Sequence, residues 1–314
     1  MLRPIFLALS KRPGLARRTL RHPALQRAAR RFVAGEQLDD AVAAVRALNS
    51  ADLAATLDFL GENTSTQAAA EGSASAYLDI LDTLRRTGVD STLSLKLTQL
   101  GLDVDDAGCE ARLARLLDRA GETFVRIDME GSAYTERTLR LFERLWAAGR
   151  RNVGVVIQSY LRRSDADVAR LIELGARVRL VKGAYAEPPA IAFPHKRDVD
   201  AAYARLAERL LRDGVDPAIA THDERLIEGV RQFATARGIA PNRFEFQMLY
   251  GIRRDLQLRL RGQGYRVRVY VPFGGEWFPY FMRRLAERPA NVMFVAASLL
   301  RDRGGRQPAA GRVR

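Results

Sequence analysis

Cysteine, histidine and tryptophan are scarce in this chain of 314 residues, which contains one, three and two of them. Because Cys109 is the single cysteine, the chain forms no internal disulfide, and a metal site built from several cysteines is excluded. His222 has no second histidine or carboxylate at ligand spacing, so we expect no zinc or other metal site. The composition is compatible with a reducing, cytoplasmic compartment.

Long apolar runs are also missing. The best candidate for a membrane span, residues 292–300, falls far below the roughly 20 apolar residues that a bilayer-crossing helix needs. We therefore expect a cytoplasmic protein that does not cross a membrane. It could still lie on the inner face of the cell membrane.

Acidic residues are absent from the first 35 positions, where arginines and lysines alternate with leucines and phenylalanines. This pattern predicts short basic amphipathic helices broken at Pro13 and Pro23, and we assign residues 1–50 to a helical N-terminal extension. Three interpretations of its basic part stay open: a membrane-surface anchor, an organellar transit peptide, or a helical preface packed on the main domain.

The formal charge of +14 indicates an anionic partner. Three classes fit this charge: a nucleic acid, an anionic membrane and an anionic cofactor. Charge alone does not choose among them. The chain has no recognisable nucleic-acid module with interleaved aromatic and basic residues, so we expect no nucleic-acid partner.

From Gly35 onward, short apolar segments alternate with amphipathic ones. Predicted strands lie at residues 53–60, 92–97, 123–129, 152–159, 177–182, 217–221, 243–249 and 266–271. Predicted helices include residues 36–50, 76–86, 136–148, 166–174, 199–212 and 225–237. Eight strand-helix repeats predict a parallel sheet closed into a (β/α)8 barrel over residues 51–300, followed by a basic, disordered tail at 301–314.

A barrel of this class carries its ligand site at the carboxyl ends of its strands. Polar residues at those ends are Glu62, Lys96, Asp128, Gln158, Lys182, Thr221, His222, Gln247 and Tyr270. Arg179 lies within an apolar strand, where a guanidinium needs an anion or an electron-rich acceptor. The structural alternatives are a buried Lys96–Asp128 ion pair and a core role for His222.

The segment after the last predicted strand places Tyr280, Arg283, Arg284 and Glu287 at i, i+3, i+4 and i+7, on one face of a helix. Two adjacent guanidinium groups are suited to gripping a carboxylate. The alternative is a solvated basic rim. The strand ends expected beneath this helix favour a small anionic ligand.

Four segments in this order resemble the proline dehydrogenases: residues 179–185, Thr221 with His222, residues 244–251, and the Tyr-x-x-Arg-Arg-x-x-Glu pattern of 280–287. The resemblance covers roughly residues 50–300. It implies a monofunctional FAD enzyme on a distorted (β/α)8 barrel whose last helix lies over the barrel mouth. It also implies oxidation of L-proline to Δ1-pyrroline-5-carboxylate, the first step of proline degradation to glutamate, by hydride transfer from proline C5 to flavin N5.

The resemblance further implies residue roles. Lys96, Arg283 and Arg284 bind the proline carboxylate, Tyr270 and Tyr280 close over the ring, and Glu287 orients Arg283. Arg179 lies beside flavin N5, and Asp128 holds the site together. We add the hypothesis that Asp128 pairs with Lys96. Residues matching the flavin-lining positions are Met129, Gln158, Val181, Lys182, Gly183, Ala184, Thr221 and His222.

Implied partners are a quinone electron acceptor, reached by peripheral association with an anionic membrane, and a separate pyrroline-5-carboxylate dehydrogenase for the product. At Ala186 the sequence differs from the large bifunctional relatives, which carry a bulky aromatic residue there.

Two alternative functions stay open. A hydroxyproline dehydrogenase would use the same carboxylate clamp, and a phosphate-binding barrel lyase or aldolase would use Lys96 or Lys182 as a Schiff-base lysine.

Overall fold

The computed structural model describes residues 29–287, with side chains described as far as Arg284. Most of the predicted basic extension, the apolar run at 292–300, the tail at 301–314 and the side chain of Glu287 therefore lie outside the described part. Within residues 29–287, no helix has the length and apolar content needed to cross a bilayer.

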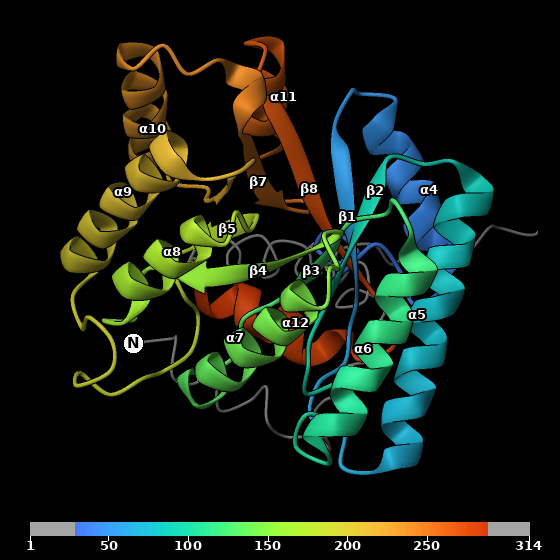
Figure 1. Ribbon diagram of the computed structural model, residues 1–314. Helices are drawn as coiled ribbons and strands as arrows, with labels where there is room; N and C mark the ends of the chain where they lie inside the picture. Colours follow the sequence, from blue (N-terminus) through green and yellow to red (C-terminus); the bar gives the residue numbers. More distant parts are fainter. Residues whose placement is uncertain (1–28, 288–314) are drawn as a thin grey trace, which may run out of the picture.

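Eight parallel strands form a closed barrel in which each strand pairs with its neighbours in the sequence and β8 pairs with β1 (Figure 1). The strands are β1 (Ala54–Phe59), β2 (Ser91–Leu95), β3 (Val125–Ile127), β4 (Val153–Gln158), β5 (Val178–Val181), β6 (Ala218–Ala220), β7 (Glu245–Leu249) and β8 (Arg266–Phe273). The predicted (β/α)8 barrel is confirmed, and each predicted strand overlaps an observed one. Most observed strands are shorter because the terminal residues already turn into loops.

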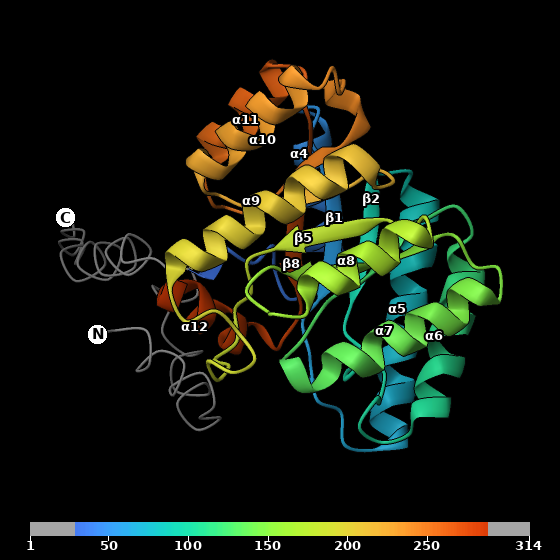
Figure 2. The same ribbon diagram turned by 60° about the vertical axis from the view of Figure 1, so that its left-hand side comes forward.

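Helices surround the barrel (Figures 1 and 2). They are α4 (Leu38–Asn49), α5 (Gln67–Thr87), α6 (Asp106–Ala120), α7 (Ser132–Ala147), α8 (Ser164–Glu173), α9 (Lys196–Asp213), α10 (Glu224–Ala236), α11 (Arg254–Gly262) and α12 (Trp277–Glu287). Helix α5 begins well before the predicted residue 76, because Thr66 caps it by accepting a hydrogen bond from the amide of Ala69 at 3.1 Å.

The barrel interior is polar, whereas the residues between strands and helices are apolar. Leu57, Leu93 and Val125 alternate along their strands with buried polar residues, and belong to the main hydrophobic core. The polar set meets across the barrel: Thr56 contacts Ser94 at 3.3 Å, and Arg179 of β5 donates to Ser94 of β2 at 3.1 Å. This interior differs from the branched apolar filling usual in such barrels, and it supplies charged groups to the strand ends.

A second, smaller hydrophobic cluster seats helix α12. Phe32 packs on Phe281 with ring centroids 6.1 Å apart, and Trp277 and Phe278 belong to the same cluster. The amide of Ala34 donates to the carbonyl of Pro272 at 2.9 Å, which ties the N-terminal segment to the end of β8. The described end of the N-terminal extension thus packs against the helix that carries Arg283 and Arg284.

Candidate active site

Helix α12 brings Arg283 to the carboxyl end of β1. Its Nη1 donates to Oε1 of Glu62 at 3.1 Å, and both side chains are partly exposed. The Arg284 guanidinium stacks over the Tyr280 ring at 4.9 Å, one helical turn away. The described partner that orients Arg283 is therefore Glu62, on the loop after β1, whereas the resemblance implies Glu287 in that role.

Lys96 pairs with Asp58 of β1, so the hypothesis of a Lys96–Asp128 pair is wrong. Its Nζ donates to Asp58 Oδ1 at 3.1 Å, and the Asp58 side chain is 1% exposed. Burial alone would lower the pKa of Lys96, but the negative charges of Asp58 and Asp128 outweigh it and hold that pKa above its usual range. Lys96 is therefore a protonated cation, which disfavours it as a Schiff-base nucleophile.

Arg179 and Asp128 meet in the barrel interior. Arg179 Nη1 donates to Asp128 Oδ1 at 2.7 Å, and the Tyr270 hydroxyl donates to Asp128 Oδ2 at 2.7 Å. The Arg179 guanidinium also lies over the Tyr270 ring at 5.5 Å. Burial raises the pKa of Asp128, against the opposing charges of Arg179 and Lys96. Asp128, just after β3, thus holds a cation of β5 and a phenol of β8 together inside the barrel.

The residues expected to line a flavin follow the ends of β3 to β6. Gln158 Nε2 donates to the carbonyl of Glu130 at 2.9 Å, and the Thr221 hydroxyl accepts from the amide of Asp223 at 3.1 Å. His222 Nε2 accepts a hydrogen bond from the amide of Leu249 at 2.9 Å. Met129, Val181, Gly183 and Ala184 lie on the same strand ends or directly after them. These positions therefore form one contiguous arc.

Lys182 lies between two carboxylates. Its Nζ donates to Asp200 Oδ1 at 2.6 Å and to Asp223 Oδ2 at 2.9 Å, and Lys196 at the start of α9 pairs with the same two aspartates. Burial alone would raise the pKa values of Asp200 and Asp223, but the hydrogen bonds from Lys182 and the positive charges of the two lysines outweigh it and lower both pKa values. Both lysines thus gather at the N-terminus of α9, where the helix dipole also favours an anion.

Gly183 has a structural reason for lacking a side chain. Its φ is +111°, and a Cβ there would lie 2.3 Å from Cδ1 of the Tyr160 ring. The sequence interpretation attributes this glycine to close approach of a cofactor, but the aromatic ring already excludes a larger residue.

Replacing Gly183 by alanine is expected to destabilise the protein by about 1–3 kcal/mol and to reduce flavin content, because the strained backbone must shift away from Tyr160. Gly72→Ala is the matched control. Gly72 lies inside α5, and apart from its chain neighbours and the nearby backbone of its own helix no described heavy atom lies within 4 Å of the position that an added methyl group would take, so alanine should stabilise by about 0.5–1 kcal/mol. Thermal denaturation and flavin absorbance check both variants; equal melting temperatures would contradict the strain argument.

Several site residues escaped the sequence analysis. Asp58 was grouped with an apolar run, although a carboxylate in a buried strand signals a cationic partner. Glu130 accepts hydrogen bonds from the Thr98 hydroxyl at 2.6 Å and from the Thr98 amide at 3.2 Å, and it ties β3 to the loop after β2. Glu245, on the inner face of β7, was not singled out either.

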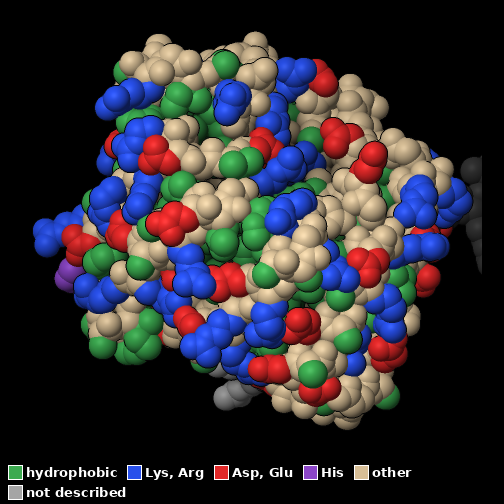
Figure 3. Space-filling model, viewed as in Figure 1, with side chains coloured by type: hydrophobic (Ala, Val, Ile, Leu, Met, Phe, Trp, Pro, Cys, Tyr) green, Lys and Arg blue, Asp and Glu red, His purple; other side chains and the backbone are tan. Residues whose placement is uncertain are grey.

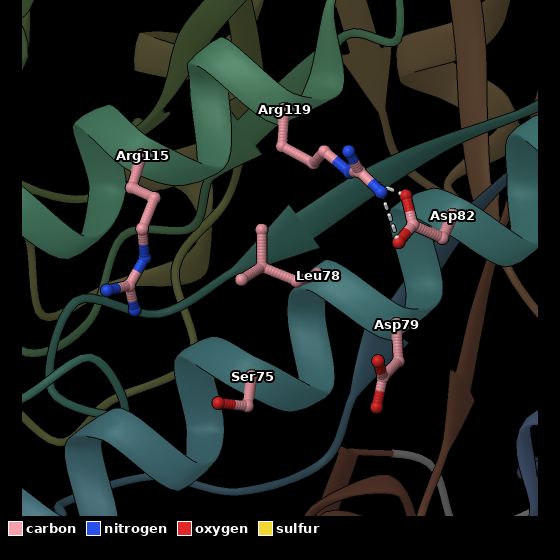
Figure 4. A pocket seen from close by; sticks show the side chains of 6 residues that line it. All are labelled: Ser75, Leu78, Asp79, Asp82, Arg115 and Arg119. Atoms are coloured by element: carbon pink, nitrogen blue, oxygen red, sulfur yellow. Dashed lines mark hydrogen bonds and ion pairs between the residues drawn. The ribbon is translucent and has the colours of Figure 1, made fainter.

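A depression between α5 and α6 lies away from the strand ends (Figure 4). Its lining comprises Ser75, Leu78, Asp79, Asp82, Arg115 and Arg119. Arg119 holds Asp82 through two hydrogen bonds of 2.7 Å, and both side chains are nearly half exposed. Such an exposed ion pair contributes little to the stability of the fold. We assign no function to this depression.

Basic and acidic side chains intermingle on the face shown in Figure 3. Many arginines on the described surface form ion pairs with acidic side chains, such as Arg150 with Asp118 and Arg144 with Glu110. The described residues contain no group of three or more histidine, cysteine or acidic side chains placed to hold a metal ion. The charged residues of interest are therefore those at the strand ends.

A closed parallel barrel with ionisable side chains converging at the carboxyl ends of its strands has the architecture of a (β/α)8-barrel enzyme. The family model described as "Proline dehydrogenase" matches residues 41–297. The chain therefore belongs to the proline dehydrogenase family, whose members are flavin-dependent oxidoreductases.

Individual relatives agree with this assignment. A proline dehydrogenase of Deinococcus radiodurans is 41% identical over 307 residues, which cover 96% of this chain and 98% of the relative. Proline dehydrogenase 1 of Bacillus subtilis strain 168 is 40% identical over 303 residues, covering 96% of this chain and 100% of the relative.

Among solved structures, proline utilization A from Bdellovibrio bacteriovorus, inactivated by N-propargylglycine, superposes with a TM-score of 0.79 at 27% identity. The match covers 84% of this chain and 33% of that larger chain. The chain thus corresponds to about a third of the larger protein, and most of the chain, including the barrel, is covered by the superposition.

Proposed function

We propose that the chain oxidises L-proline to Δ1-pyrroline-5-carboxylate, with FAD accepting a hydride from proline C5 at flavin N5. The observation that carries this proposal is that Lys96, which follows β2, and Arg283 of α12, the neighbour of Arg284, act on one region of the barrel mouth. The half-buried Tyr185 lies within electrostatic reach of both Lys96 and Arg283, so the cations of β2 and α12 act on one region. Cations converging on one region suit a small carboxylate.

The other half of the substrate is a saturated ring, and aromatic side chains supply its surroundings. Tyr280 is buried on the inner part of α12, and the Tyr270 hydroxyl is fixed by Asp128. In this arrangement the carboxylate clamp fixes one end of the ring and the tyrosines restrict the rest, which holds C5 in a single orientation. Glu62 orients Arg283 for that clamp.

The residues present fit FAD. A guanidinium has five N–H groups. In Arg179, three of them donate to the described residues Gln247, Asp128 and Ser94, so two N–H groups are left to donate to a ligand. Lys182 and Lys196 lie at the N-terminus of α9, where the diphosphate would share their ammonium groups with Asp200 and Asp223. The lining would come from Met129, Gln158, Val181, Gly183, Ala184, Thr221 and His222.

Within this site, the two remaining N–H groups of Arg179 would stabilise the negative charge that develops at flavin N5. Asp128 keeps Arg179 and Tyr270 in place. The substrate amine must lose its proton before its lone pair can expel the hydride. Asp128 is already engaged by two donors, so we assign this proton to water.

The test is to incubate the FAD-loaded protein with L-proline and a soluble quinone analogue, and to trap the product with o-aminobenzaldehyde, which forms a coloured adduct with Δ1-pyrroline-5-carboxylate. We expect the adduct with L-proline and slower turnover of hydroxyproline. Faster turnover of hydroxyproline would favour the alternative dehydrogenase. Borohydride trapping of a colourless protein on a carbonyl substrate would favour the Schiff-base lyase.

For the electrons we propose a membrane quinone as acceptor. The supporting observation is the run of arginines and lysines without acidic residues in the first 35 positions, which suits peripheral docking on an anionic bilayer. The product would then pass to a separate pyrroline-5-carboxylate dehydrogenase. Co-sedimentation with vesicles containing anionic lipid tests the docking, and binding that is equal on neutral vesicles would contradict it.

A further inference from the structure

Strand β7 presents two polar side chains, Glu245 and Gln247, to the barrel interior. They are two residues apart on one strand and so share a face, and they are 6% and 4% exposed. A carboxylate buried this deeply needs partners. The partners connect this part of the barrel to Arg179.

Glu245 is anchored by two arginines of β8. Both of its oxygens accept from Arg268 Nε, at 3.0 and 3.2 Å, and one also accepts from Arg266 Nη2 at 3.2 Å. Arg268 is itself fixed by a 2.7 Å hydrogen bond from Nη1 to the carbonyl of Ala55. Glu245 is therefore an immobile negative charge bound to the neighbouring strand.

Gln247 bridges Glu245 and Arg179. Its Nε2 donates to Glu245 Oε1, and its Oε1 accepts from Arg179 Nε at 2.5 Å. The carboxylate can only accept and the guanidinium can only donate, so the amide has one possible orientation. The negative charge of Glu245 also polarises the amide and strengthens its oxygen as an acceptor.

Gln247 holds the Nε edge of Arg179, while Asp128 and Ser94 hold the two Nη groups at 2.7 and 3.1 Å. Contacts at three separate nitrogens fix the plane of the guanidinium. Removing the Nε contact would leave both remaining contacts on one side of the group and allow it to rotate about them.

We propose that Glu245 and Gln247 are positioning residues that hold Arg179 against the flavin and thereby set the flavin's reduction potential. This rests on the proposed function, in which Arg179 lies beside flavin N5. A fixed cation stabilises the negative charge that accompanies reduction, and a loosened cation stabilises it less.

The test uses Gln247→Met in the FAD-loaded enzyme, with the midpoint potential, flavin content, and kcat and KM for proline as readouts. We expect reduction to become about tenfold less favourable, which is about 30 mV more negative for a two-electron couple. We also expect kcat to fall about tenfold, which is less than the roughly 100- to 1,000-fold loss when such a donor is removed outright, with KM changed less than about twofold. Gln247→Asn, which withdraws the amide by one methylene, applies the same test if the methionine variant does not fold.

Gln257→Met is the matched control. Gln257 is also a buried glutamine, but it donates to the carbonyls of Leu249 and Ile252 and has no contact with Arg179. We expect it to lower stability and leave the potential unchanged. An unchanged potential in both Gln247 variants, beside a shifted potential in Arg179→Lys, would overturn the inference. If Arg179→Lys leaves the potential unchanged as well, the proposed place of the flavin is wrong instead.

Discussion

Replacing both Arg283 and Arg284 by methionine is expected to raise the KM for proline by at least about 100-fold while the protein keeps its flavin. A hydrogen bond to a charged group contributes about 1.5–3 kcal/mol, and each 1.4 kcal/mol is a factor of ten in affinity. Each single variant should therefore weaken proline binding by roughly 10- to 150-fold. The two effects need not add, because both guanidinium groups act on the same carboxylate.

Steady-state kinetics and flavin absorbance check this prediction, and Arg140→Met provides the control. Arg140 lies on α7, is 69% exposed and pairs only locally with Glu136, so its loss should change KM and stability very little. If the double variant loses its flavin and keeps its proline affinity, α12 is a wall of the cofactor site. The carboxylate clamp would then have to be placed elsewhere.

Replacing Arg179 by methionine is expected to lower kcat by about 100- to 1,000-fold, equivalent to about 2.7–4 kcal/mol, the range found when one preorganised donor to developing charge is removed. The KM for proline should change much less, because the hydrogen-bond partners of Arg179 among the described residues are Asp128, Ser94 and Gln247, none of which belongs to the carboxylate clamp. Stopped-flow measurement of flavin reduction separates this step from reoxidation.

Arg179→Lys is the informative companion variant. Lysine keeps the charge but cannot span three acceptors in one plane, so its rate should lie between those of the parent and the methionine variant. A methionine variant that reduces its flavin at the parent rate would contradict a catalytic role for Arg179. Loss of folding would instead show that Arg179 serves the barrel interior.

The barrel was predictable from the sequence because each strand is a short segment that is either apolar or alternates apolar with polar residues, and the segments recur between amphipathic helices. The start of α5 was not, because residues 67–75 are mostly alanine, serine and glycine and show little amphipathic pattern. Their helix depends on the cap at Thr66 and on packing against α6. Neither signal is visible as a periodic apolar stripe.

Side-chain partners inside the barrel were harder to predict than the strands. The register places Asp58 opposite Ser94, next to Lys96, and this pairing depends on how β1 lies against β2. Likewise, Arg179 meets Gln247, which is 68 residues away in the sequence. A sequence shows that a buried charge needs a partner, but strand register decides which residue provides it.

The arginine pair of α12 shows what context adds. By its sequence alone, the segment has the features of a solvated basic rim as well as those of a carboxylate clamp. The structure seats its aromatic face on residues 29–36 and ties Arg283 to Glu62 at the end of β1. This packing fixes the helix beside the strand ends, where its guanidinium groups are useful to a small anionic substrate.

The most direct test of the account is an anaerobic titration of the purified, FAD-loaded protein with L-proline, followed by the visible absorbance of the oxidised flavin. We expect a yellow protein that bleaches as proline is added, because in the proposed function the substrate reduces the flavin. Absorbance that persists at saturating proline, in a protein with full flavin content, would contradict the proposed function.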